Sequence, residues 1–188
     1  MQSILSHLPT IETKRLILRP LTIADDEAIY AYASDPEVSK TVSFETARSI
    51  EDTRTFIKSA LDNYAKSIDP ASFGIVLKKE NRLIGTIGYL NWSNDHKRFE
   101  IGYALSRLYW NNGIVTEAAN AMIDYFFEHS DIIRIEARCL LENPASARVM
   151  EKAGMTFEGI LRKQAYFKGH HRDMKIYSIL KDEWETKK

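Results

Sequence analysis

EIGYALSRLYWNNGIVTEA, residues 100–118, is the stretch that decides the fold. Its first six residues are rich in β-branched, aromatic and aliphatic side chains, which predicts a strand, and from Thr116 the apolar residues recur at helical spacing. The first amides of such a helix lack intrahelical partners and carry the positive end of the dipole, so they can receive a phosphate. Gly113 lets the backbone approach that anion closely. Many packed strand-to-helix connections share this pattern, so further evidence must decide between packing and anion binding.

The patterns on either side predict an α/β fold. Strands are expected at residues 13–21, 72–77, 82–90, 100–105, 132–140, 156–166 and 172–180. Helices are expected at residues 22–33, 45–66, 116–129 and 144–153, with a polar loop at 92–97. The order β-α-α-β-β-β-α-β-α-β-β corresponds to a mixed, mostly antiparallel sheet of about seven strands with helices on both faces.

Composition is that of an ordinary globular protein. The chain has 188 residues, 44% hydrophobic and 28% charged, which suits one domain with its own core. Lys plus Arg and Asp plus Glu each number 26, so no overall charge attracts nucleic acid or an anionic membrane. We expect one domain over residues 1–188, ordered at about 10–184, with neither nucleic acid nor membrane as a partner.

Cysteine and histidine usage argues against a disulfide and a metal site. Cys139 is the single cysteine and lies in an apolar strand pattern, so it is interpreted as a buried small hydrophobe. His170 and His171 are adjacent and point apart on an extended chain, and the histidines form no metal site. The N-terminus lacks a secretory pattern, and no run of about eighteen apolar residues exists, so a cytoplasmic location is expected.

Two strings together resemble a known family. WNNGIVTEA (residues 110–118), followed by ENPASARVMEKAGM (142–155), resembles the GCN5-related N-acetyltransferase (GNAT) superfamily, specifically its ribosomal-protein N-terminal acetyltransferase (RimJ/RimL-like) branch. TKRLILR (13–19) matches the string that opens the domain in that branch, so the resemblance covers nearly the whole chain. It implies an acetyl-CoA-dependent N-acetyltransferase in which an amine attacks the thioester directly in a ternary complex.

The resemblance also implies which residues hold acetyl-CoA. The family's pyrophosphate motif [Q/R]-x-x-G-x-[G/A] falls on residues 110–115, where only the middle glycine agrees strictly and Val115 is bulkier than usual. The central strand is implied to splay from the strand at 132–140, so that the pantetheine arm adds there as a pseudo-strand. The expected cofactor-binding residues are Tyr103, Ala104, Leu105, Asn112, Gly113, Ile114, Val115, Thr116 and Asn143. Asn143 can also be a helix cap, and Glu117 is interpreted as a helix-start carboxylate.

Three residues are candidate catalysts. Many superfamily members place a tyrosine where this chain has Met150, so the N-x-x-S serine, Ser146, is nominated to protonate the leaving thiolate. Glu136 and Glu100 are candidate bases for the amine, directly or through water. Glu136 alternates with Arg134 and Arg138 on one strand face, so a structural ion pair is an equal possibility. Ala165 stands near a position where some relatives carry a carboxylate.

The acceptor amine stays open at this point. A protein N-terminal α-amine and a small amine, such as a polyamine, an antibiotic or an amino-acid compound, both fit, and a non-catalytic acyl-CoA-binding sensor is the alternative to an enzyme. Tyr30, Tyr32, Phe44 and Phe56 are either acceptor contacts or core residues of the early helices. The strand at 172–180 is expected at a sheet edge that needs cover, so a homodimer is possible.

Overall fold

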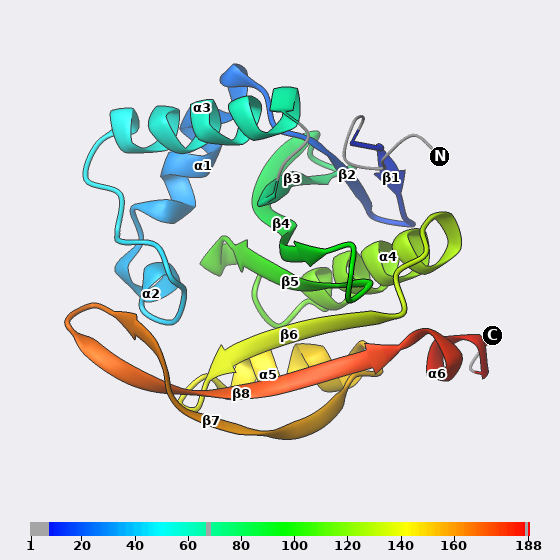
Figure 1. Cartoon of the computed structure of the whole chain (residues 1–188). Helices are drawn as coiled ribbons and strands as arrows, with labels where there is room; N and C mark the ends of the chain where they lie inside the picture. Colours follow the sequence, from blue (N-terminus) through cyan, green and yellow to red (C-terminus); the bar gives the residue numbers. More distant parts are fainter. Residues whose placement is uncertain (1–7, 67–68, 187) are drawn as a thin grey trace.

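An eight-stranded sheet organises residues 8–66, 69–186 and 188, which the computed structural model describes (Figure 1). The strands are β1 (Ile11–Glu12), β2 (Leu16–Pro20), β3 (Ala71–Leu77), β4 (Arg82–Ser93), β5 (Arg98–Leu105), β6 (Arg134–Leu140), β7 (Thr156–Phe167) and β8 (His170–Leu180). The helices are α1 (Asp26–Ala33), α2 (Pro36–Ser39), α3 (Ile50–Lys66), α4 (Ile114–His129), α5 (Pro144–Lys152) and α6 (Lys181–Thr186), with 3₁₀ turns η2 (Ile23–Asp25) and η3 (Arg107–Tyr109). The expected α/β class is confirmed.

The strand order is β1-β2-β3-β4-β5-β6-β8-β7. All neighbouring strands are antiparallel except β5 and β6. These two run parallel because α4 returns the chain from the end of β5 to the level at which β5 began, so that β6 runs in the same direction. The parallel pair sits in the middle of the sheet. The stretch that opened the sequence argument therefore forms the crossover between these two strands, and α5 makes a second crossover, from β6 to β7 past β8.

Helices cover both faces of the sheet, and side-chain alternation along β5 separates the two layers. Phe99 and Ile101 join the core cluster that contains α4 and α5. Ala104 joins the cluster of α1 and α3 on the other face. Glu100 is four residues before Ala104 on the same strand, and side chains alternate between the faces, so Glu100 also lies on the face of α1 and α3.

An aromatic cluster fixes β4 and β5 on α4. The ring of Trp92 stacks on Phe99 with centroids 5.2 Å apart, and Phe99 meets Phe126 edge-on at 4.9 Å. Tyr89 contacts all three rings. Trp92 was expected in a polar loop, but β4 extends through it because its ring belongs to this core.

Hydrogen bonds from side chains shorten several predicted elements. The carboxylate of Asp25 accepts from the amide of Thr22 at 2.7 Å, which winds residues 23–25 into η2, and α1 begins only at residue 26. Asp52 accepts from the amides of Arg48 and Ser49, and α3 begins at residue 50 rather than 45. The short α2, which the pattern did not predict, starts at the cap Asp35. α6 and the two-residue β1 were also missed.

The expected edge strand is wrong. β8, which contains residues 172–180, pairs with β6 on one side and β7 on the other, so β7 is the edge. His170 and His171 lie within β8, and the turn before them is Lys168-Gly169, both with positive φ. A homodimer remains a prediction, but residues 172–180 do not form the exposed sheet edge on which that prediction was based. No helix in the described part of the chain has the length and apolar character that a membrane crossing requires.

Candidate active site

β5 and β6 separate halfway along their length, which opens a split between the two strands. They pair from Arg98 with Arg134 to Ile101 with Ala137, and there the pairing stops. β5 continues against β4 as far as Leu105, whereas β6 continues against β8. Residues 102–105 therefore present a strand edge without a partner among the described residues, which is what an amide-bearing chain needs to add as a pseudo-strand.

The start of α4 is held by an arginine from the other end of the chain. Gly113 caps the helix in the left-handed conformation, with φ +70°, which glycine adopts without a steric cost. Arg15 donates from Nη1 to the carbonyl of Asn112 at 2.9 Å and from Nε to Glu117 at 2.6 Å. This arginine fixes the loop and adds positive charge next to the free amides of the first turn.

Glu117 is a structural carboxylate, as the sequence interpretation held. It accepts from the hydroxyl of Thr13 at 2.6 Å and from the amide of Arg15 at 2.9 Å, besides the guanidinium. Partial burial acts to raise the pKa of Glu117, but these hydrogen bonds outweigh it and lower that pKa. No sequence pattern predicted these contacts of Thr13 and Arg15, which the resemblance placed only in the string that opens the domain.

Two hydroxyl groups meet on the α5 side of the split. The side chain of Asn143 accepts from the amide of Ser146 at 3.0 Å and so caps α5. The hydroxyl of Ser146 lies 2.8 Å from the phenol of Tyr103, which reaches it from β5. Burial raises the pKa of the Tyr103 phenol, so this group stays protonated at neutral pH. From the sequence, Tyr103 was expected to contribute only its backbone, as part of the strand edge that binds the pantetheine arm.

Cys139 of β6 completes this cluster. It is buried, as expected of a small hydrophobe. Burial raises the pKa of its thiol, and the charge of Lys175 and the nearby Ser146 side chain oppose that effect. The thiol therefore stays protonated at neutral pH, and it lies against the serine that the sequence nominated.

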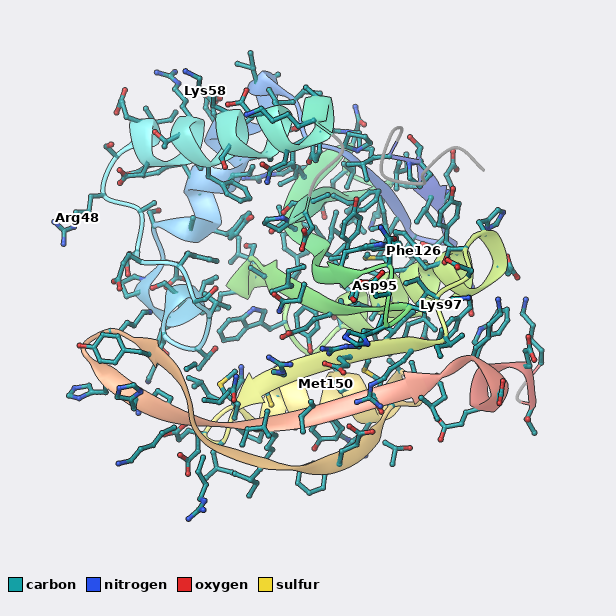
Figure 2. All side chains as sticks on the ribbon, viewed as in Figure 1. Arg48, Lys58, Asp95, Lys97, Phe126 and Met150 are labelled. Carbon is teal, nitrogen blue, oxygen red and sulfur yellow. The ribbon has the colours of Figure 1, made fainter. Side chains whose placement is uncertain are left out.

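Two residues that depart from the family pattern, Met150 and Val115, are buried in the core, whereas Ala165 on β7 is partly exposed. Met150 of α5 (Figure 2) is 1% exposed and belongs to the core cluster that contains α4 and α5. Val115 is 8% exposed and belongs to the same core cluster, as does Ile114. The bulk of Val115 therefore occupies the core, and Ile114 and Val115 can serve an anion only through their backbone amides.

A cavity of about 740 Å³ opens on the face of α1 and α3. Its floor is formed by β4 and by Gly102, Tyr103 and Ala104 of the unpaired segment of β5. Of the aromatic residues weighed as acceptor contacts, Tyr32, Phe44 and Phe56 line it, and Tyr30 is absent from the described lining. Tyr32 and Phe44 also pack in the core cluster of α1 and α3, so these two residues both line the cavity and belong to the core. The size suits a small ligand.

Glu136 is the centre of an ion cluster. Its carboxylate binds Arg98 at 2.9 Å, Arg134 at 2.8 Å and Arg138 at 3.2 Å. Burial acts to raise the pKa of Glu136, but the three guanidinium groups outweigh it and lower that pKa. This arrangement favours the ion-pair interpretation over a proton-accepting role.

Glu100 lies next to Glu136 across the parallel pair, in a different environment. It accepts from the side-chain amide of Asn91 at 3.0 Å, and Arg138 lies 3.4 Å away. Burial raises the pKa of Glu100 in spite of Arg138. Its register partner on β4 is Leu90, which lines the cavity, so Glu100 shares that face beside the cavity floor.

Comparison with known proteins decides the family. The sequence profile of the acetyltransferase (GNAT) domain matches residues 15–156. This chain belongs to the GNAT family. The uncharacterized N-acetyltransferase YoaA of Bacillus subtilis (strain 168) is 36% identical to this GNAT chain over 173 residues, covering 92% of this chain and 97% of that protein. A GNAT acetyltransferase structure from Bacillus anthracis shares the fold with a TM-score of 0.82 at 34% identity, over 93% of this chain and 99% of that one.

The GNAT chain is an N-acetyltransferase, in agreement with its relatives. A more distant relative, the ribosomal-protein-serine acetyltransferase of Escherichia coli (strain K12), is 27% identical over 139 residues, 72% of this chain and 74% of that protein. Two solved structures of this fold, 20% and 24% identical with TM-scores of 0.81 and 0.82, hold coenzyme A and acetyl-CoA respectively.

The GNAT fold brings the predicted site residues together in three groups, one of which is the pair Glu100 and Glu136 across β5 and β6. Residues 112–116 lie at the start of α4, where Gly113 and Thr116 line a second cavity of about 590 Å³. Tyr103 and Ser146 lie at the split itself, with Asn143 capping the helix that carries Ser146. Among the described residues, no three His, Cys, Asp or Glu side chains are grouped as metal ligands.

Proposed function

We propose that this GNAT domain transfers the acetyl group of acetyl-CoA to a primary amine by direct attack in a ternary complex. The observation that carries the proposal is the position of residues 102–104, which form both the unpaired edge of β5 and the floor of the cavity. A thioester on that edge and an amine in that cavity would meet at one backbone segment. Proximity of this kind is a large part of catalysis in acyl transfer.

The acyl donor is acetyl-CoA, and two features of the chain receive it. Its pyrophosphate lies at the amides of Gly113, Ile114, Val115 and Thr116, next to Asn112, where the helix dipole and Arg15 favour negative charge. Its pantetheine arm pairs with the edge formed by Tyr103, Ala104 and Leu105, and Asn143 contacts that arm from the start of α5. An amide near Leu105 polarises the thioester carbonyl.

The chemistry uses groups on both sides of the split. The amine nitrogen attacks the carbonyl carbon, and its proton passes to Glu100 directly or through water. The C–S bond then breaks, and the thiolate takes a proton from Ser146, which regains one from the Tyr103 phenol at 2.8 Å. The cycle closes when Glu100 releases the amine proton to water and the Tyr103 phenolate takes a proton from water. Glu136 remains a candidate base in principle, but its three arginines favour its charged form and make it a poor proton acceptor.

One specific acceptor has independent support. The relationship to the E. coli ribosomal-protein-serine acetyltransferase supports the ribosomal-protein (RimJ/RimL-like) branch, with a protein N-terminal α-amine as acceptor. A small amine is the second candidate, and the cavity of about 740 Å³ supports it because that volume fits a small ligand.

A thiol-release assay tests the proposal. The purified protein is incubated with acetyl-CoA and separate panels of peptides with N-terminal Ser or Ala and of small amines, and acetylated products are verified by mass. We expect release that depends on both substrates and falls in S146A. Tight acetyl-CoA binding without turnover, unaffected by S146A, would instead establish an acyl-CoA sensor. Absence of both binding and turnover would overturn the proposal.

A further inference from the structure

The cavity beside β5 contains a buried hydroxyl group without a partner. Thr53 of α3 lines the cavity and is 2% exposed, and its Oγ1 has no hydrogen-bond partner among the described residues. Leaving such a group unsatisfied costs about 1–3 kcal/mol, so native proteins rarely do so without a reason. A ligand in the cavity is the reason that the position of Thr53 indicates.

Two other hydroxyl groups of the lining satisfy each other. The phenol of Tyr32 and the hydroxyl of Thr86 lie 3.1 Å apart and bond to each other. Among the described residues that line the cavity, Thr53 is the one with a fully buried side-chain oxygen or nitrogen that has no hydrogen-bond partner. Threonine in a helix has two accessible χ1 rotamers, so its hydroxyl can turn toward a bound molecule.

The charged residues of the lining do not face a ligand from within. Asp52 uses its carboxylate on the amides of Arg48 and Ser49. The side chain of Arg48 projects away from the molecule (Figure 2), and Glu45 is exposed. Apolar and aromatic groups form much of the wall: Ile29, Phe44, Phe56, Ile87 and Tyr89. Apart from Asp52, a polyamine or another polycation would thus meet only the exposed Glu45 and, beside the floor, Glu100, so its remaining charges would lie uncompensated in the cavity, which is costly.

The cavity limits the size of the acceptor. Thr53 and residues 102–104 of β5 line the same cavity of about 740 Å³. The amine must reach residues 102–104, so an acceptor that also contacts Thr53 extends across this cavity. An aromatic ring with a short aminoalkyl chain is a ligand of suitable size.

We propose that the acceptor is a compact primary amine with an apolar or aromatic body and one hydrogen-bonding group at the end remote from the amine, which Thr53 receives. This inference rests on the proposed function, because it assumes that acetyl transfer occurs at residues 102–104. It selects the small-amine candidate over a protein N-terminus. Thr53 is then a specificity residue, remote from the reacting atoms.

A matched pair of amines tests this role. Tyramine and phenethylamine differ by one hydroxyl at the end remote from the amine, so the ratio of their kcat/KM values isolates that group. We expect the wild type to prefer tyramine by about tenfold, T53V to lower the ratio to about one, and T53S to restore most of it. T53V keeps the shape of the side chain, and its unfolding temperature should equal or exceed that of the wild type.

Each opposite result has its own meaning. A tyramine preference that survives T53V, or a loss of stability in T53V, would show that the Thr53 hydroxyl has a structural role and overturn the inference. Acetylation of Ser- or Ala-initiated peptides, with neither aromatic amine accepted, would overturn the acceptor class and leave the proposed function intact. Failure of acetyl-CoA itself to bind would instead defeat the proposed function.

Discussion

The phenol of Tyr103 and the hydroxyl of Ser146 lie 2.8 Å apart, although 43 residues separate them in the chain. The phenol comes from the strand on one side of the split and the hydroxyl from the helix behind the other side. Met150 occupies the position where many superfamily members have a tyrosine, and the proposed mechanism takes its phenol from a different element, β5. Burial keeps the phenol protonated, as a donor requires.

A double-mutant cycle tests the pair. Y103F and S146A should each lower kcat by about 10- to 100-fold while the KM for acetyl-CoA changes little, since general acids contribute effects of this order. The double variant should lose little more than either single variant, because the two groups act on one proton. Losses that multiply, or single losses below about twofold, would separate the pair from proton transfer.

The base is tested by the pH dependence of kcat/KM. Glu100 must be deprotonated to accept a proton, so the rate falls as pH drops through its pKa. Because burial raises that pKa, the fall should begin at a higher pH than for an exposed glutamate, near 4.3. E100Q should lower kcat by about a hundredfold and remove this acidic limb.

E136Q is the matched control for E100Q, since both residues are buried and adjacent across the parallel pair. It leaves Arg98, Arg134 and Arg138 without their shared carboxylate, so it should destabilise the fold by about 1–3 kcal/mol, less than a fully buried pair because the arginines are partly exposed. A folded E136Q protein that loses the acidic limb would identify Glu136 as the base.

Glu158 gives a prediction for stability against pH. Its bonds to Arg134 and Ser178 lower the pKa of its carboxyl to about 2. The pKa is depressed in the folded state, so the stabilisation is complete above the unfolded value, near 4.3, and is lost as pH falls toward 2. The side chain is 37% exposed, which limits the gain to about 1 kcal/mol or less.

Urea unfolding at several pH values measures this contribution. The difference in unfolding free energy between wild type and E158Q should shrink as pH drops from about 5 to about 2. E185Q, at an exposed position of α6, controls for the loss of one negative charge. A difference independent of pH would show that Glu158 is not coupled to folding through its charge.

Local pattern predicted much of this fold. Alternation along residues 134–138 placed Arg134, Glu136 and Arg138 on one face, and all three meet there. The cap Asn143 and the glycine before α4 were likewise local signals. These features depend on residues close in sequence, where spacing fixes which side chains share a face.

Contacts that depend on register or on distant elements escaped prediction. Arg98 joins Glu136 only because β5 and β6 run parallel in a particular register. The phenol of Tyr103 meets Ser146 only because α5 packs behind the split. Boundaries shifted wherever a carboxylate captured backbone amides, as Asp52 does before α3. Tertiary packing decides such contacts, and one sequence carries little trace of it.

The most direct test of the account is a calorimetric titration of acetyl-CoA into the wild type, G113D and G113N. Asp and Asn both tolerate the left-handed conformation of Gly113, and a Cβ there lies 3.7 Å from Arg15 Nη2, so the two variants differ mainly in charge. The account predicts binding by the wild type, somewhat weaker binding by G113N, and affinity lower by about a hundredfold or more in G113D. Equal affinities of G113D and G113N, or no binding by the wild type, would contradict an anion site at the start of α4.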